Sequence, residues 1–124
     1  MRLLLDTQIF LWWASDSPRL SPALRDAIAA DETDVFVSIA SAWEIEIKRA
    51  IGKLWAPSDF RAALEMAVFT LLPIELRHIE ALVTLPLHHR DPFDRMLIAQ
   101  ASVEGMALAS ADDAFRRYGI VPLR

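Results

Sequence analysis

The sequence predicts a three-layer α/β/α sandwich built on a mainly parallel sheet of four to five strands. Short apolar runs alternate along the chain with longer segments whose apolar residues recur at helical spacing. Strands separated by helices pair in parallel through right-handed crossovers, and helices then cover both faces of the sheet. The length of 124 residues fits one domain, over 1–124, and leaves no room for a second.

The first half of the chain predicts a strand over 3–5, a helix over 7–14, a helix opening at 22, a strand over 35–37 and a helix over 39–51. The leucine run over 3–5 is a short buried strand that ends at Asp6. Ser21 before Pro22 is a typical helix N-cap followed by proline at the first helical position. In the last of these helices apolar residues stand four apart, at Ile39, Trp43, Ile47 and Ile51. We expect this stripe to face the core, and Gly52 to end the helix.

The second half predicts a helix capped by Ser58 and running to 68, a strand over 71–74, helices over 75–84 and 92–104, a strand over 106–109, a short helix over 112–118 and a weak strand over 120–121. Pro73 cannot donate a hydrogen bond to a neighbouring strand, so the strand over 71–74 belongs at an edge of the sheet. Asp91 before Pro92 opens the longest of these helices, and Gly105 ends it.

Composition and charge exclude several classes of function. Thirteen basic and seventeen acidic residues give a formal charge of −4, so any nucleic-acid site must be a local basic rim. The absence of cysteine excludes disulfides, thiolate zinc sites and a cysteine nucleophile. The three glycines are too dispersed for a dinucleotide loop or a P-loop. No apolar run approaches the roughly 18 residues that cross a bilayer, which predicts a soluble, cytoplasmic protein without membrane contact.

Four acidic residues stand where a parallel sheet would gather them. Asp6 ends the first strand, Glu44 lies in the helix after the second, Asp94 in the first turn of the helix from 92, and Asp112 after the strand over 106–109. Ligands bind at the carboxyl edge of such sheets, where the winding reverses. Two carboxylates about 5 Å apart repel by about 3 kcal/mol at an effective dielectric constant of 20, so a cluster of them calls for a cation. Oxygen ligands without thiolates suit Mg²⁺ or Mn²⁺.

Each of these acids also has an ordinary structural interpretation. Asp6 can cap the following helix, and Glu44 can pair with Lys48 one turn later. Asp94 lies in a first turn, where an acid suits the helix dipole, and either Asp112 or Asp113 can cap the last helix. Only their convergence at one edge of the sheet favours a shared site.

Two other kinds of site have weaker support. A phosphatase with an aspartyl nucleophile after the first strand would need a second aspartate two residues on, and Gln8 stands there. His88 and His89 lie beside Asp91, but adjacent histidines point apart on an extended chain, and no third zinc ligand stands at familiar spacing. His78, within a helix, is expected to be an ordinary surface or partly buried residue.

Four segments resemble the PIN domain of VapC-like toxin ribonucleases from type II toxin–antitoxin pairs, and together they cover essentially the whole chain in the family's order. They are Leu4-Leu5-Asp6-Thr7 followed by Leu11-Trp12-Trp13; Ser41-Ala42-Trp43-Glu44-Ile45 with Lys48 and Gly52-Lys53-Leu54; the segment 89–101 around Asp91 and Asp94; and Leu108-Ala109-Ser110-Ala111-Asp112 with Phe115 and Tyr118. The segment 89–101 is the most distinctive. Ser110 stands where the family commonly has threonine, which keeps a hydroxyl group at that position.

The resemblance implies a PIN-like fold and an endoribonuclease that hydrolyses RNA phosphodiester bonds with a water activated by Mg²⁺ or Mn²⁺. It makes Asp6, Glu44, Asp94 and Asp112 the metal-ligating and catalytic residues. Thr7, Ser38, Asp91 and Ser110 would support those ligands, with Asp91 or Asp113 as further candidates for metal contact. Lys48, Lys53, Arg90 and Arg95 are candidates for RNA binding, and Arg95 for stabilising the leaving oxygen.

The same resemblance implies an antitoxin protein that blocks the acidic site, and a homodimer. The alternative is a catalytically silent PIN-like module that binds RNA or protein. Because all four acids are present, the active enzyme is the preferred hypothesis.

Overall fold

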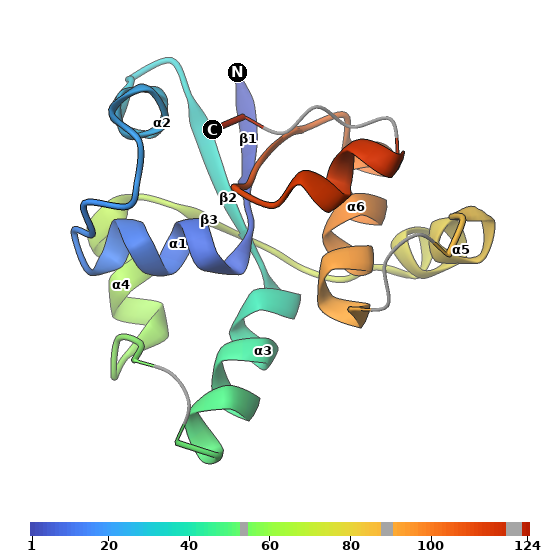
Figure 1. The fold of residues 1–124 in the computed structure, drawn as a ribbon, viewed down its shortest axis with the longest axis horizontal. Helices are drawn as coiled ribbons and strands as arrows, with labels where there is room; N and C mark the ends of the chain where they lie inside the picture. The colour runs from blue at the N-terminus through green and yellow to red at the C-terminus, as the bar shows by residue number, and fades with distance from the viewer. Residues whose placement is uncertain (53–54, 88–90, 119–122) are drawn as a thin grey trace.

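A parallel sheet organises the chain, as the computed structural model shows for residues 1–52, 55–87, 91–118 and 123–124 (Figure 1). Its four strands among these residues are β1 (Arg2–Leu5), β2 (Asp34–Ser38), β3 (Thr70–Leu72) and β4 (Ala107–Ala109). All neighbouring strands pair in parallel, in the order β3-β2-β1-β4. The chain winds outward from β1 to β3 and then crosses back, so the winding reverses between β1 and β4. The predicted sheet is confirmed, with β3 at an edge.

Helices cover both faces of the sheet. They are α1 (Thr7–Ala14), α2 (Pro22–Ala29), α3 (Ile39–Ala50), α4 (Phe60–Ala67), α5 (Leu76–Thr84), α6 (Pro92–Glu104) and the 3₁₀ helix η1 (Asp113–Tyr118). Figure 1 shows α1, α2 and α4 on one side of the sheet and α5 and α6 on the other. Among the described residues, no helix has the length and apolar character that a membrane span requires.

The leucine run of β1 supplies both layers of the core, because successive side chains of a strand point to opposite faces. Leu3 and Leu5 pack with residues of α1, α2 and α4, whereas Leu4 packs with residues of α6, β4 and η1. All three leucines are fully buried, and burying each contributes about 1.5–3 kcal/mol. The two separate clusters confirm the three-layer architecture.

Helix boundaries follow local hydrogen-bond chemistry closely. The Ser21 hydroxyl accepts from the Leu24 amide at 3.1 Å, and the Asp91 carboxylate accepts from the Phe93 amide at 2.8 Å. Gly105 ends α6 in the left-handed conformation, at φ 65°. One predicted cap was wrong. The Asp59 carboxylate, not the Ser58 hydroxyl, accepts from the Ala62 amide and caps α4, which begins at Phe60. An aspartate is an equally good cap, so the sequence alone did not separate these neighbours.

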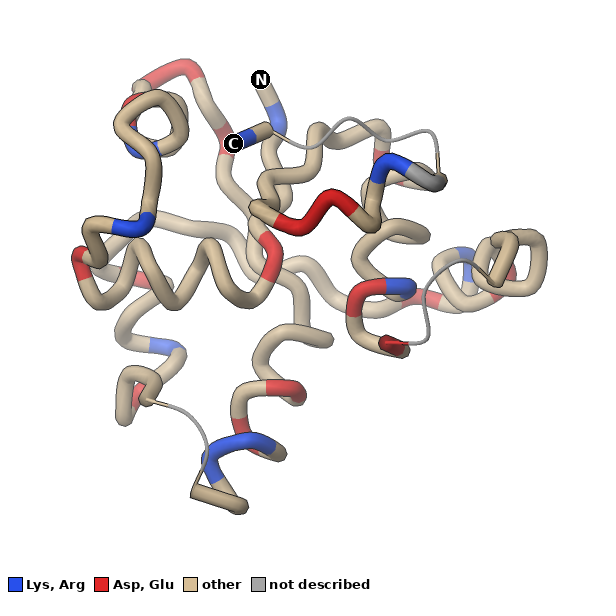
Figure 2. Tube along the Cα trace, viewed as in Figure 1, with Lys and Arg blue, Asp and Glu red and all other residues tan. Residues whose placement is uncertain are grey.

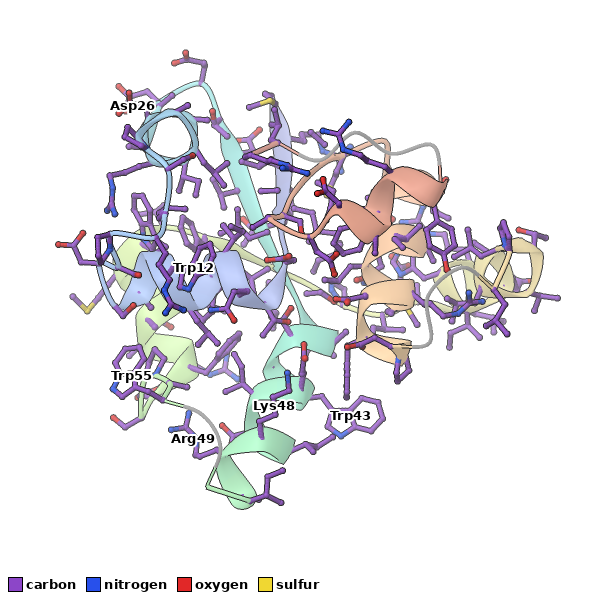
Figure 3. All side chains as sticks on the ribbon, viewed as in Figure 1. Trp12, Asp26, Trp43, Lys48, Arg49 and Trp55 are labelled. Carbon is purple, nitrogen blue, oxygen red and sulfur yellow. The ribbon has the colours of Figure 1, made fainter. Side chains whose placement is uncertain are left out.

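The predicted core stripe of α3 was also wrong. Ile39, Trp43, Ile47 and Ile51 are 38%, 62%, 42% and 61% exposed. The helix instead buries Ala40, Ser41, Glu44 and Ile45. The Trp43 ring packs edge-on against Phe93 of α6, 5.3 Å between centroids, and points away from the sheet (Figure 3). The reason is that α3 turns its small and polar side towards α1 and α6, where Ser41 and Glu44 have hydrogen-bond partners.

The carboxyl terminus differs from the prediction in one more respect. Residues 113–118 form a 3₁₀ helix, and the predicted strand over 120–121 lies outside the described residues. Leu123 forms an isolated parallel bridge with Ala109, so the chain does return to the edge of β4.

Candidate functional site

A cleft of about 320 Å³ opens at the carboxyl ends of β1 and β4, where the winding of the sheet reverses. Its lining comprises Asp6, Thr7, Gln8, Leu11, Glu44, Lys48, Asp91, Asp94, Ala111 and Asp112. We call this the acidic cleft. Figure 2 shows acidic segments from four parts of the chain around the centre of the molecule. The fold therefore brings together the four acids that the sequence singled out.

Asp6 lines the acidic cleft and is only 6% exposed. Its backbone amide donates to the Ala109 carbonyl at 3.0 Å, and its carboxylate accepts from the Ile9 amide at 2.8 Å, which caps α1. The pKa of Asp6 is raised from 3.8 to about 6, chiefly by burial and to a smaller extent by the charges of Asp112 and Glu44, against hydrogen bonds from Ser110 and Ile9 that lower it. The ionised form of Asp6 is thus unfavourable in this setting.

Glu44 is buried on α3 with both carboxylate oxygens engaged. The Thr7 hydroxyl, 2.9 Å from the Ser41 hydroxyl, donates to Oε1 at 2.6 Å. The Lys48 ammonium donates to Oε2 at 2.7 Å. This hydrogen bond raises the pKa of Lys48, and the charges of Glu44, Asp91 and Asp94 raise it as well. Lys48 is therefore a firmly charged cation within the acidic cleft.

The remaining acids come from two loop–helix junctions. Asp91 caps α6 and orients its first turn, in which Asp94 lies. The Asp112 amide donates to the Ser110 hydroxyl at 2.9 Å, and Ser110 also hydrogen-bonds Asp6. The buried Ser110 side chain thus connects two of the acids. Asp113 does not line the cleft; its carboxylate pairs with Arg116 at 3.2 Å and with Arg124.

Several predicted supporting and RNA-binding residues lie elsewhere. The buried Ser38 hydroxyl caps α3 and donates to Gln100 Oε1 at 2.6 Å, so it joins α3 to α6 and does not line the cleft. Arg95 donates to the carbonyls of Pro86 and Leu82 and to the Tyr118 hydroxyl, which ties α6 to its neighbours. Its predicted contact with RNA stays a prediction. Lys53, Arg90 and the histidine pair 88–89 lie outside the described residues.

Sequence reasoning missed two residues of this arrangement. Ser41 lies beside Thr7 and so helps to fix Glu44. Gln100 accepts from Ser38 and donates to the Pro73 carbonyl at 3.2 Å. Ser41 precedes Glu44 by three residues, which places both on the same face of a helix, and this spacing could have revealed it. Gln100 carries no comparable signal, because its partners are distant in the sequence.

The acidic cleft fits a hard divalent cation. Five carboxylates and one ammonium line it among the described residues, and no thiolate or imidazole contributes. Carboxylate oxygens of this kind suit Mg²⁺ or Mn²⁺. Burial is the main cause of the raised pKa of Asp6, so the protein alone stabilises the ionised carboxylate poorly. A bound cation would stabilise the ionised form of that carboxylate.

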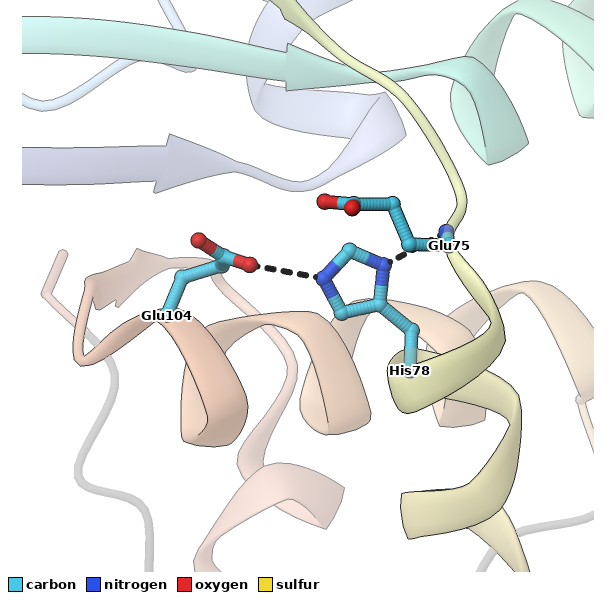
Figure 4. A group of neighbouring side chains, drawn as sticks. All are labelled: Glu75, His78 and Glu104. Carbon is cyan, nitrogen blue, oxygen red and sulfur yellow. Dashed lines mark hydrogen bonds and ion pairs between the residues drawn. The ribbon is translucent and has the colours of Figure 1, made fainter.

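A second cluster has closer spacing but a different charge balance (Figure 4). Ligand atoms of Glu75, His78 and Glu104 all lie within 4.8 Å of one another, the only such group among the described residues. The acids of the cleft are therefore spaced more widely, which leaves room for a cation that keeps part of its water shell. In the second cluster Arg77 pairs with both glutamates, and His78 Nε2 lies 2.8 Å from Glu104. Those carboxylates already have cationic or hydrogen-bonding partners.

Comparison with known proteins shows which family the chain resembles and which solved structures share its fold. A family model described as PIN domain matches residues 3–121. No curated protein matches this chain in sequence. The structure of VapBC2 from Rickettsia felis, bound to a promoter DNA fragment, has a similar chain with a TM-score of 0.68 and 15% identity, covering 100% of this chain and 98% of that one.

Two further solved structures are similar over nearly their whole length. FitAcB from Neisseria gonorrhoeae gives a TM-score of 0.67 at 15% identity, covering 98% of this chain and 96% of that one. A toxin–antitoxin complex from Klebsiella pneumoniae gives 0.66 at 18% identity, covering 96% and 95%. At these identities the likeness establishes the fold.

Proposed function

The chain belongs to the PIN domain family, and on that premise we propose that it is a metal-dependent endoribonuclease, the toxin of a type II toxin–antitoxin pair. The observation that carries the proposal is the acidic cleft, where five carboxylates from four segments surround a single ammonium among the described residues. A protein without a use for this charge would have no reason to gather it at a sheet edge.

Asp6, Glu44, Asp94 and Asp112 are the residues that would hold Mg²⁺ or Mn²⁺. Hydroxyl groups hold three of these acids in place, and a helix cap positions the fourth. Thr7 and Ser41 orient Glu44, Ser110 joins Asp6 to Asp112, and Asp91 holds the turn that presents Asp94. Each acid is fixed by a neighbour of its own, which favours a preorganised site over a loose surface cluster.

The substrate class follows from the chemistry of the cleft. A divalent cation supplies activation of water and neutralisation of charge on the phosphoryl group of a phosphodiester. The protein contributes the geometry of the acids, while Lys48 places a positive charge at the same cleft, where an RNA phosphate would lie. Because an RNA target is cytoplasmic in a bacterium, the cytoplasmic location expected from the sequence is part of this proposal.

The partner is proposed from the similar structures. The three are described as VapBC2, FitAcB and a toxin–antitoxin complex. We therefore expect an antitoxin protein that blocks the acidic cleft of this chain, and a homodimeric toxin as the sequence resemblance implied.

Cleavage of RNA by the purified protein tests the proposal. Labelled single-stranded RNA is incubated with wild type in Mg²⁺, in Mn²⁺ and in EDTA, beside Asp6→Asn, Asp94→Asn and Asp26→Asn. The exposed Asp26 lies on α2, away from the cleft (Figure 3), and its change alters the charge equally. We expect metal-dependent cleavage that falls about 100-fold or more in the first two variants only.

Other outcomes would change the assignment. Full activity in both cleft variants would show that the site is wrong. Binding of RNA without cleavage in any metal would favour the silent binding module. Growth arrest on expression of wild type, relieved in the cleft variants, would separately support the toxin.

A further inference from the structure

Lys48 occupies a distinctive position, because among the described residues it is the only basic side chain that lines the acidic cleft. It lies one turn after Glu44 on α3, in the order that favours pairing of the two charges. The Lys48 side chain is 47% exposed, whereas that of Glu44 is 6% exposed. A flexible cation is thus placed on a fixed, buried carboxylate.

The two oxygens of Glu44 differ in what holds them. Oε1 accepts from the buried Thr7 hydroxyl, which in turn contacts the buried Ser41. These three groups belong to α1 and α3, whose packing fixes them. Among the described residues, Oε2 accepts a hydrogen bond from Lys48 alone, and the Lys48 side chain can swing away through its four methylene groups. Oε2 is therefore the oxygen that can exchange one cation for another.

We propose that the Lys48 ammonium holds the cation position at Glu44 until a divalent ion displaces it, and that the released ammonium then binds an RNA phosphate. The first half of this inference rests only on the metal site of the proposed function, whereas the second half rests also on its RNA substrate. Lys48 is then a positioning residue that lowers metal affinity by itself and couples metal binding to RNA binding.

The coupling follows from thermodynamic linkage. A divalent ion frees Lys48 for the phosphate, and a phosphate that draws Lys48 away frees Oε2 for the ion. Each ligand therefore strengthens the binding of the other by the same factor. An ordinary surface ion pair between Glu44 and Lys48 would give no such reciprocity.

Mn²⁺ binding measured by calorimetry, without RNA, tests the first half. Lys48→Met removes the charge and keeps most of the length of the side chain, Lys48→Gln is a second neutral variant, and Lys48→Arg retains the charge. Arg61→Met removes one positive charge from an exposed position on α4, outside the cleft. We expect Mn²⁺ to bind about fivefold more tightly to both neutral variants, and with wild-type affinity to the other two.

Equal or weaker Mn²⁺ binding by the neutral variants overturns the exchange, provided that their circular dichroism matches wild type. An equal gain in Arg61→Met also overturns it, because the effect would then come from net charge. Since half-exposed Lys48 contributes little to the core, at least one neutral variant is expected to fold.

Binding of a hydrolysis-resistant phosphorothioate RNA oligonucleotide, with and without Mn²⁺, tests the second half. We expect Mn²⁺ to strengthen RNA binding by wild type about fivefold more than by Lys48→Met. The same gain in both proteins overturns the coupling. Tighter Mn²⁺ binding by Lys48→Met, with no RNA binding by any form, supports the exchange at Glu44 and overturns the proposed function instead.

Discussion

The acidic cleft and the cluster around His78 both bring carboxylates together from distant parts of the chain, but their charges are balanced differently. The His78 cluster consists of Arg2, Glu75, Arg77, His78 and Glu104, which join the start of β1 to α5 and the end of α6. It has two guanidinium groups for two carboxylates. The acidic cleft has five carboxylates and one ammonium among the described residues.

The direction of the pKa shifts follows this difference. A hydrogen bond from His78, followed by the charge of Arg77, lowers the pKa of Glu104. Burial and two neighbouring acids raise the pKa of Asp6 to about 6. Ionised Glu104 therefore favours the folded protein, whereas ionised Asp6 opposes it. Close spacing alone therefore does not single out a cation site, because the carboxylates of the His78 cluster already have cationic partners.

Metal binding should separate the two regions most strongly. We expect Asp94→Asn to weaken Mn²⁺ binding about 10- to 100-fold, because it removes a carboxylate of the cleft. Glu104→Gln should bind Mn²⁺ with wild-type affinity, since Glu104 already pairs with Arg77 and His78. Calorimetry on the two variants measures this, and the reverse ranking would place the cation in the His78 cluster.

Asp6→Asn should stabilise the protein at neutral pH in EDTA. Asparagine can still cap α1, while the buried charge is removed. Because the folded pKa of about 6 exceeds the unfolded value, folded Asp6 retains a proton that the unfolded chain releases, and the free energy of unfolding falls as pH rises from about 4 to 6. Above pH 6 the variant should be more stable by up to about 3 kcal/mol.

Urea unfolding at several pH values checks this expectation, with Asp26→Asn as the control. The advantage of Asp6→Asn should shrink to nothing near pH 4. If Asp6→Asn were less stable than wild type at pH 8, the claim that ionised Asp6 opposes folding would be wrong.

His78→Ala should destabilise the protein by about 2 kcal/mol. The ring is fully buried, and the Glu75 amide donates to Nδ1 at 2.9 Å, so Nε2 carries the proton that is donated to Glu104. Removal leaves a cavity and an unpaired amide at the start of α5. Thermal unfolding measures the loss of stability. Unchanged stability would mean that the His78 cluster does not stabilise the fold.

Glu104→Gln should have the smallest effect, below about 1 kcal/mol at pH 7, because Arg2 and Arg77 are about half exposed. The lowered pKa of Glu104 means that its contribution is present at neutral pH and is lost as the carboxylate is protonated in acid. The variant should therefore lose less stability than wild type on acidification. A steeper acid dependence in the variant would contradict this assignment.

Most helix and strand positions could be predicted from the sequence because the deciding interactions are local. The N-caps Ser21 and Asp91 bond amides two or three residues later, and Gly105 takes a left-handed conformation that suits glycine. The four acids could be predicted to meet because parallel strands place their carboxyl ends at one edge. Neither inference needed a distant contact.

The direction in which a helix faces, and the charge balance of a cluster, were decided only by the tertiary structure. The apolar stripe of α3 has the spacing of a core face, yet Glu44 and Ser41 face inward because Thr7 lies there to bond them. No feature of the sequence indicated the role of His78, because its partner Glu104 is twenty-six residues away in the sequence and lies within hydrogen-bond reach only in the folded chain. Sequence periodicity fixes which residues share a face, because the pitch of a helix is a local property. Which face is buried depends on partners that only the folded chain brings together.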